Sequence, residues 1–300
     1  MLSKITDRGI LSRPQDFIIS GSLRLQTEIL YREGNSSGRR ALFLHGGGVT
    51  GNHTIVRRPA MWLIRNGGFG EIILPDRRGS GESSPFTRQM SLSELALDMK
   101  LLLDAMELKE RITLIGQSYG GLISLHLASM DKRVEKVILL ASSPIFTLKE
   151  GPLSIPYRLG LLLPSIKFII RLFLGRAESP GGVDLDFIYD IEYPPAYVKA
   201  QIRILKEMKR SRLKSLLLQA ESVFLEENTL LQESLSPGVP VIQVIGEKDR
   251  TWEKNIPVRY LKNMPLFRQA VIKGASHKDI FRRAEEFLLG ALALDEDDMQ

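Results

Sequence analysis

The 300-residue sequence contains no cysteine. This absence excludes a disulfide scaffold, an iron–sulfur cluster, a zinc–cysteine centre and a cysteine nucleophile. Only four histidines are present, which leaves little imidazole for a metal centre, and we expect neither a metal nor an organic cofactor. With 43% hydrophobic and 25% charged residues, the composition is that of an ordinary globular protein.

Long apolar runs are also absent. The most apolar stretch, 159–175, is interrupted by Pro164, Lys167 and Arg171, so it is too short and too charged to span a bilayer. The first twenty residues lack the apolar run of roughly 7–15 residues that marks a signal peptide. We therefore expect a cytoplasmic protein without stable membrane insertion.

The net charge of +6 is a modest excess over 300 residues. Basic residues cluster only at 206–214, where contact with a nucleic acid or an anionic lipid is one interpretation. We favour the other, a solvated helix face. The expected partner is therefore a small-molecule substrate and not a nucleic acid, while the oligomeric state stays open.

Short apolar runs alternate with helical patterns along much of the chain. This alternation predicts β-α-β units, which form a mostly parallel sheet flanked by helices. We expect strands at 16–20, 23–32, 40–44, 71–74, 111–115, 134–141, 239–245 and 268–272, and helices at 55–65, 92–108, 119–130, 256–263 and 278–294.

The alternation stops between Pro144 and Ser236. Helical patterns occur near 156–175, 195–210 and 212–232, but no buried strand is evident. The economical interpretation is one α/β core, formed by 1–143 and 237–300, that carries an inserted helical cap at 144–236.

A serine lies in a glycine-rich turn between an expected strand and an expected helix. The segment reads Gly116-Gln117-Ser118-Tyr119-Gly120-Gly121. A sharp strand-to-helix turn would lift the Ser118 hydroxyl above the sheet and direct the N-terminus of the helix toward it. We predict Ser118 as a nucleophile and the backbone N–H of Tyr119 as an oxyanion donor. An accidental glycine–serine loop is the alternative.

A second glycine cluster, His45-Gly46-Gly47-Gly48, follows the expected strand 40–44. Glycines let backbone N–H groups approach a bound carbonyl closely. We predict the Gly47 N–H as the other oxyanion donor, with the Gly46 N–H next, and His45 as a residue that orients the loop. The alternative is a plain flexible loop.

A serine nucleophile needs a histidine base, which in turn needs a group that orients it. His126 lies eight residues beyond Ser118 on the same helix, about 12 Å along the axis and out of reach. His53 follows the glycine cluster and could line the mouth of a pocket. His277 follows the strand 268–272, at the strand end where parallel sheets bind ligands. We predict His277 as the base.

An acidic partner for His277 is expected after the strand 239–245. Glu247 and Asp249 both follow this strand, and since they lie two residues apart in a turn, only one can face the histidine. Asp279 is expected to point elsewhere.

The segment 76–83 reads Asp-Arg-Arg-Gly-Ser-Gly-Glu-Ser. We interpret Asp76 as structural, a carboxylate that locks neighbouring loops together with a guanidinium. A catalytic Asp76 is the alternative.

These pieces, in this order, resemble the α/β-hydrolase superfamily over nearly the whole chain. The resemblance implies an α/β-hydrolase fold with a helical cap, and the order Ser…Asp…His is the family's order. The family places its acid in G-x-x-D after the strand that follows the cap, which selects Asp249. The implied triad is Ser118, Asp249 and His277, with the backbone N–H groups of Gly47 and Tyr119 as the oxyanion hole.

The resemblance leads us to predict a serine hydrolase, a carboxylesterase that cleaves a carboxylic ester through an acyl-enzyme. Aromatic residues of the cap suggest an apolar entrance for an apolar ester, although they could instead form the cap's own core. They are Phe146, Phe168, Phe173, Phe187, Tyr189, Tyr193 and Tyr197.

Other activities of the superfamily remain open. The segment 76–83 and the glycine cluster look like prolyl iminopeptidases, which usually carry Gln where Arg77 stands and Trp where Tyr119 stands. A carbon–carbon bond hydrolase would use the same triad. Epoxide hydrolases and haloalkane dehalogenases use an Asp nucleophile, which Ser118 argues against. Outside enzymes, the alternatives are a ligand receptor on a hydrolase scaffold and a membrane-surface protein.

Overall fold

The computed structural model describes residues 4–7, 9–34, 38–48, 51–144, 162–174, 196–224, 237–252, 254–256, 261, 264 and 266–296. The strands are β1 (Lys4–Asp7), β2 (Ile10–Ser20), β3 (Leu23–Arg32), β4 (Arg39–Leu44), β5 (Phe69–Pro75), β6 (Ile112–Gln117), β7 (Val134–Leu140), β8 (Val241–Gly246) and β9 (Phe267–Ile272). The helices are α1 (Thr54–Asn66), α2 (Leu92–Ala105), α3 (Tyr119–Met130), α5 (Leu162–Leu174), α6 (Ala196–Glu207), α7 (Arg210–Phe224), α10 (Asp279–Arg282) and α11 (Ala284–Glu296).

The strands form one nine-stranded sheet in the order β1-β2-β3-β5-β4-β6-β7-β8-β9. The pairs among β1, β2, β3 and β5 are antiparallel, and every pair from β5 to β9 is parallel. The α/β-hydrolase fold with a mostly parallel sheet is therefore confirmed. Because parallel strands end at the same edge, the segments after β4, β5, β6, β8 and β9 converge there.

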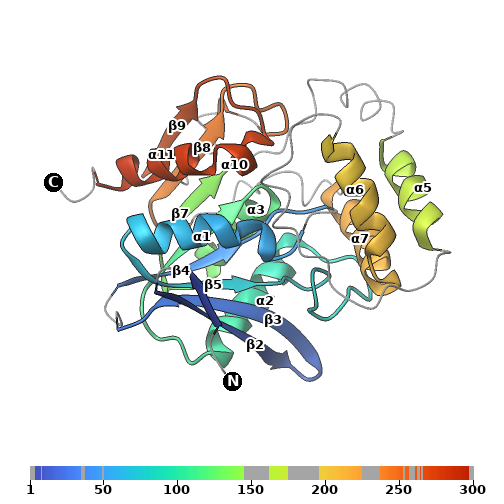
Figure 1. The fold of residues 1–300 in the computed structure, drawn as a ribbon, viewed down its shortest axis with the longest axis horizontal. Coiled ribbons are helices and arrows are strands. Elements are labelled where there is room, and N and C mark those ends of the chain that lie inside the picture. The colour runs from blue at the N-terminus through green and yellow to red at the C-terminus, as the bar shows by residue number, and fades with distance from the viewer. Residues whose placement is uncertain are drawn as a thin grey trace.

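Helices cover both faces of the sheet (Figure 1). The apolar side of α2 and the nearly all-apolar α3 pack on one face, while α1 and α11 pack on the other. Strands β6 and β8 are buried along their whole length. This burial is expected of parallel strands covered on both sides, which are mostly apolar along their length.

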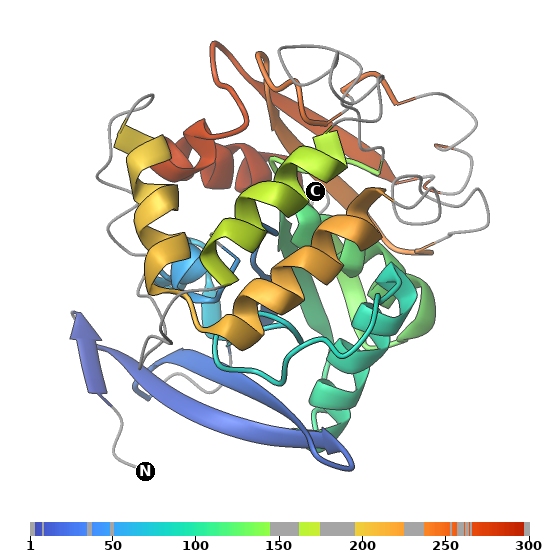
Figure 2. The ribbon, with the colours of Figure 1, turned by 90° about the vertical axis from the view of Figure 1, so that its right-hand side faces the viewer.

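The helices α5, α6 and α7 gather at one end of the molecule, at the right in Figure 1 and in front of the sheet in Figure 2. They share a small apolar cluster of their own, formed by Ile170, Leu205, Leu213 and Leu216. None of the described helices combines the length and the apolarity that a bilayer-spanning segment requires.

Several expected elements differ from the observed ones at their ends. Strand β2 begins at Ile10, six residues before the expected start. The polar residues Arg13 and Gln15, with Pro14 between them, mask the strand pattern in the sequence. The expected helix 278–294 is divided into α10 and α11 at Arg283, whose backbone leaves the helical region at φ −119°. Most of the expected helix 256–263 lies outside the described residues.

Candidate active site

Ser118 occupies a strained turn between β6 and α3. Its backbone has φ 50° and ψ −121°, a region that non-glycine residues rarely adopt and that tends to occur at functional sites. The Ser118 N–H donates to the Leu140 carbonyl at 3.0 Å, and the Ser118 carbonyl accepts from Ser142 Oγ at 2.7 Å. Bonds to the end of β7 and the residues after it thus hold the strained conformation.

Two glycines beside Ser118 are required by close packing. A Cβ on Gly116 would lie 2.4 Å from the Cα of Gly121, and a Cβ on Gly120 would lie 2.3 Å from the carbonyl oxygen of Leu44. Both distances are far shorter than a van der Waals contact, so a side chain at either position would push α3 away from the sheet. The structure thus gives the reason for the glycines of this turn.

The three side chains of the expected triad lie in one hydrogen-bonded chain. Ser118 Oγ is 3.2 Å from His277 Nε2, and His277 Nδ1 is 2.9 Å from Asp249 Oδ2. With the ring proton on Nδ1, His277 donates to Asp249 and accepts from Ser118, a tautomer assigned from this network. Asp249 is 3% exposed and the His277 side chain is 25% exposed. The carboxylate is therefore buried, while the imidazole is partly exposed to solvent.

The turn after β8 fixes the position of Asp249 and keeps Glu247 out of this chain of hydrogen bonds. Asp249 Oδ1 accepts the N–H groups of Thr251 at 2.8 Å and Trp252 at 3.2 Å, which leaves Oδ2 for His277. Glu247 instead accepts the N–H of Gly274 at 2.7 Å. Asp279 also points elsewhere, as expected, since it accepts the N–H and the hydroxyl of Ser276.

The glycine cluster after β4 lies against the Ser118 turn. A Cβ built on Gly46 would be 3.4 Å from Ser118 Cβ, and one built on Gly47 would be 3.1 Å from Tyr119 Cβ. Within the described part of the chain, the N–H groups of Gly47 and Tyr119 donate to no protein acceptor. The Gly48 N–H is engaged instead, by Gln219 Oε1 of α7 at 3.1 Å.

Two buried side chains hold the glycine cluster from behind. His45 Nδ1 donates to the Gly46 carbonyl at 2.8 Å, and His45 Nε2 accepts the N–H of Arg77 at 3.4 Å. Burial, and then the Arg77 charge, keep the pKa of His45 well below its ordinary value, so the ring is neutral. This arrangement agrees with a loop-orienting His45. Arg77, which sequence reasoning did not assign to this loop, donates to the same carbonyl at 2.6 Å.

Asp76 joins two loops, but its partner is a histidine and not the expected guanidinium. It accepts from the N–H of His53 at 2.7 Å, from His53 Nδ1 at 2.9 Å and from the N–H of Glu82 at 3.0 Å. Burial alone would raise the pKa of Asp76, yet its bonds with His53 lower it to about 2. His53 is thus bound to this carboxylate. The neighbouring Arg78 pairs with Asp98 of α2, at 2.9 and 2.6 Å.

The remaining candidates lie away from the triad. His126 is buried within α3 beside Ser93, and burial lowers its pKa to about 4. The described part of the chain has no group of three or more His, Asp or Glu side chains placed to hold a metal ion. In the basic run, Lys209 pairs with Glu82 at 2.9 Å.

Two of the aromatic side chains expected to form an apolar entrance lie among the described residues. Phe168 is 63% exposed, and Phe173 packs against the apolar cluster of α5, α6 and α7. The side chains of Phe146, Phe187, Tyr189, Tyr193 and Tyr197 lie outside the described residues.

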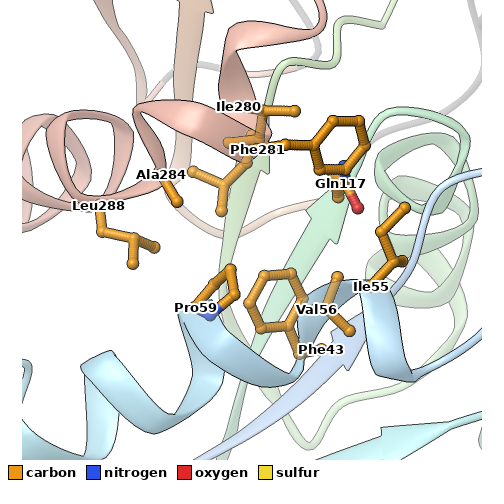
Figure 3. A pocket seen from close by; sticks show the side chains of 10 residues that line it. Phe43, Ile55, Val56, Pro59, Gln117, Ile280, Phe281, Ala284 and Leu288 are labelled. Atoms are coloured by element: carbon orange, nitrogen blue, oxygen red, sulfur yellow. The ribbon is translucent and has the colours of Figure 1, made fainter. Parts of the chain in front are cut away.

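A small apolar gap lies next to Gln117, between the sheet and the helices α1, α10 and α11 (Figure 3). Phe43, Val56 and Phe281 contribute side chains to its wall, and its volume is about 10 Å³. This space is too small for any substrate, so we regard the gap as a packing defect.

Comparisons with known structures support the fold. The 2-hydroxy-6-oxo-6-phenylhexa-2,4-dienoate hydrolase of Rhodococcus sp. strain RHA1 is 17% identical, with a TM-score of 0.69 over 96% of this chain and 99% of that one. A thermophilic esterase from Thermogutta terrifontis is 16% identical, with a TM-score of 0.63 over 95% and 97%. At these identities the likeness concerns the fold alone.

Comparisons of sequence identify the family. A Synechocystis protein named as a non-heme chloroperoxidase is 27% identical over 137 residues, which are 45% of this chain and only 48% of that protein. The chain thus matches about half the length of this curated relative. Residues 41–288 match the model of the alpha/beta hydrolase family. The chain therefore belongs to the alpha/beta hydrolase family.

Proposed function

We propose that the protein is a serine carboxylesterase, which cleaves a carboxylic ester through an acyl-enzyme. The observation that carries the proposal is the chain of bonds from Ser118 through His277 to Asp249. It begins at a strained residue beside the Gly47 and Tyr119 N–H groups, which donate to no acceptor among the described residues. A nucleophile, a base, an orienting acid and oxyanion donors are the parts that acyl transfer requires.

In the proposed first step, Ser118 Oγ attacks the ester carbonyl while His277 Nε2 takes its proton. The Asp249 carboxylate stabilises the imidazolium that forms. The backbone N–H groups of Gly47 and Tyr119 donate to the oxyanion of the tetrahedral intermediate. Each such donor contributes roughly 10²–10³ to kcat, and an intact triad up to about 10⁶.

The second half of the reaction releases the two products in turn. His277 gives its proton to the leaving alkoxide, so the alcohol departs neutral and Ser118 stays acylated. The same imidazole then activates a water molecule, which hydrolyses the acyl-enzyme. No cofactor enters these steps.

The segment 144–236 is proposed to act as the cap over this site. Support comes from α7, whose Gln219 binds the Gly48 N–H in the glycine cluster 45–48, which we call the oxyanion loop. The separate apolar cluster of α5, α6 and α7 gives further support. We propose an apolar ester of small or medium acyl length as the substrate. A nucleic acid is a poor candidate, since Lys209 of the basic run is paired within the chain.

The test compares initial rates on p-nitrophenyl butyrate, proline p-nitroanilide and a β-diketone, for wild type and Ser118→Ala. We expect ester turnover that the substitution abolishes. Preference for the anilide would move the assignment to an aminopeptidase, and preference for the diketone to a carbon–carbon hydrolase. Tight ligand binding without Ser118-dependent turnover would contradict an enzyme and favour a receptor.

A further inference from the structure

Arg77 is a buried cation without a carboxylate partner among the described residues. Its side chain is 0% exposed, and its Nε and Nη1 atoms make no hydrogen bond there. The adjacent Asp76 directs its oxygens to His53 and Glu82. A buried, incompletely paired charge lowers the stability of a fold. We therefore expect Arg77 to have a functional role that offsets this loss of stability.

The shortest hydrogen bond that this guanidinium makes among the described residues reaches the expected oxyanion loop. Arg77 Nη2 donates to the Gly46 carbonyl at 2.6 Å. That carbonyl belongs to the same peptide unit as the Gly47 N–H. Because C=O and N–H point in opposite directions across a trans peptide, the bond to Arg77 fixes the direction in which the Gly47 N–H points.

The charge also strengthens this N–H as a donor. A guanidinium bound to the oxygen of an amide withdraws electron density from it, and chains of hydrogen bonds polarise each other in this way. In a buried setting the effect is larger than in water, since the dielectric screening is weaker. The Gly47 N–H is thereby both oriented and polarised before any substrate binds.

Arg77 also contacts Tyr119, the residue of the other expected donor of the oxyanion hole. The carbon of its guanidinium is 5.2 Å from the centroid of the Tyr119 ring, within the range of a cation–π contact. Tyr119 supplies the second expected oxyanion donor, and burial raises the pKa of its phenol to about 12. One cation thus lies against both residues whose N–H groups would hold the oxyanion.

We infer that Arg77 is a positioning residue of the oxyanion hole, which orients and polarises the Gly46–Gly47 peptide and supports the oxyanion with its charge. The inference rests on the proposed serine-hydrolase function. Burial lowers the pKa of Arg77 only to about 10, so the side chain remains cationic near neutral pH.

The test compares Arg77→Met, Arg77→Gln and Arg78→Gln. Methionine removes the charge and every N–H donor, whereas glutamine removes the charge but keeps an amide NH2 group as a donor. Arg78→Gln is the matched control, because it removes a charge from the same loop, at a side chain that contacts Asp98 and not the glycine cluster. Thermal unfolding shows which variants fold. If Arg77→Met does not fold, the test uses Arg77→Gln alone.

Two readouts separate positioning from general stability. The first is the split between kcat and KM on a p-nitrophenyl ester. The second is the rate ratio between this ester and its thionoester, in which sulfur replaces the carbonyl oxygen and accepts hydrogen bonds poorly. We expect kcat to fall about tenfold to a hundredfold in Arg77→Met and less in Arg77→Gln, with KM nearly unchanged. The oxygen-to-sulfur ratio should fall in both.

The outcomes distinguish this inference from the proposed function. If the Arg77 variants match Arg78→Gln in kcat and in the oxygen-to-sulfur ratio, the inference about Arg77 is overturned. The esterase proposal would still stand in that case, provided that the wild type reacts at Ser118. A wild type that neither hydrolyses the ester nor reacts with a fluorophosphonate at Ser118 would overturn both.

Discussion

At the scale of single residues, the candidate site depends on which oxygen of Asp249 faces His277. Two backbone N–H groups hold Oδ1, so Oδ2 alone remains for the imidazole. This fixes the proton on Nδ1 and leaves Nε2 as the acceptor for the Ser118 hydroxyl. In the proposed mechanism, the negative charge of Asp249 also stabilises the imidazolium.

Asp249→Asn should therefore remove activity without removing the fold. The amide can donate to Nδ1 and so favour the wrong tautomer, and we expect kcat on a p-nitrophenyl ester to fall by three to four orders of magnitude, about the loss known for such changes. Glu247→Gln, in the same turn but bound to Gly274, should change kcat by less than about twofold. Equal losses in the two variants would contradict the assigned acid.

Local patterns could place some of the candidate residues. Ser118 and His277 each follow a short apolar strand, and the structure brings their side chains to 3.2 Å from one another. The order of elements left two acidic residues open, and only the family resemblance selected Asp249. Arg77 was not assigned to the oxyanion loop because its partner Gly46 lies 31 residues earlier in the chain. Only packing brings the two together, and a local pattern cannot show this.

At the scale of elements, α7 docks on the core through a polar face. Ser215, Gln219 and Ser222 are spaced so that they share one side of the helix. They accept the backbone N–H groups of Phe86, Gly48 and Met90 at 2.9, 3.1 and 3.2 Å. Because these side chains bind particular backbone N–H groups, they fix the position of α7 on the core. Apolar contacts alone would fix it less well.

Gln219→Ala should weaken the link between this helix and the oxyanion loop. Loss of the bond to the Gly48 N–H removes about 1 kcal/mol of docking energy, and we expect kcat to fall about threefold to tenfold. Ser215→Ala removes an equivalent bond to Phe86, outside the oxyanion loop, and serves as the control. Both variants are compared by steady-state kinetics and thermal unfolding. A Gln219→Ala enzyme with the kcat of the control would contradict this coupling.

Element prediction was accurate in the parallel part of the sheet and weaker elsewhere. Buried strands such as β6 read as continuous apolar runs between turns. The edge strand β1 and the first half of β2 were missed. In β2, Arg13 and Pro14 are exposed and Gln15 is half-buried, so no apolar run or regular alternation marks the strand.

At the scale of the whole molecule, buried ionic contacts join segments far apart in the sequence. Glu28 of β3 pairs with Arg57 of α1 at 2.7 Å, and lies 3.6 Å from His53, which binds Asp76. Burial alone would lower the pKa of His53, but the Asp76 carboxylate, followed by Glu28, gives a net rise. The cluster thus links the N-terminal hairpin, α1 and the loop after β5.

The stability of the protein should depend on pH through this cluster. A raised pKa of His53 stabilises the fold below the unfolded value of about 6.5, and this contribution is lost as pH rises through the folded value. The Asp76 contribution is present above pH 3.8 and is lost toward its folded pKa of about 2. Both therefore act fully between about pH 4 and 6.5.

His53→Gln tests this dependence by urea unfolding at pH 5.5 and pH 8.5. The variant should lose more free energy of unfolding, relative to wild type, at pH 5.5 than at pH 8.5. His126→Gln is a control of opposite sign. Because burial lowers the pKa of folded His126 to about 4 while an unfolded histidine titrates at about 6.5, His126→Gln should cost less free energy of unfolding at pH 5.5 than at pH 8.5. A loss for His53→Gln that is the same at both pH values would contradict a charged His53–Asp76 pair.

The most direct test of the central claim is the mass of the covalent intermediate. Wild-type protein is mixed with p-nitrophenyl butyrate, quenched in acid within milliseconds and digested for mass spectrometry. The account predicts a butyryl group on the peptide that contains Ser118, in wild type and not in Ser118→Ala. Ester turnover without any acylated Ser118, or acylation at another residue, would contradict the account.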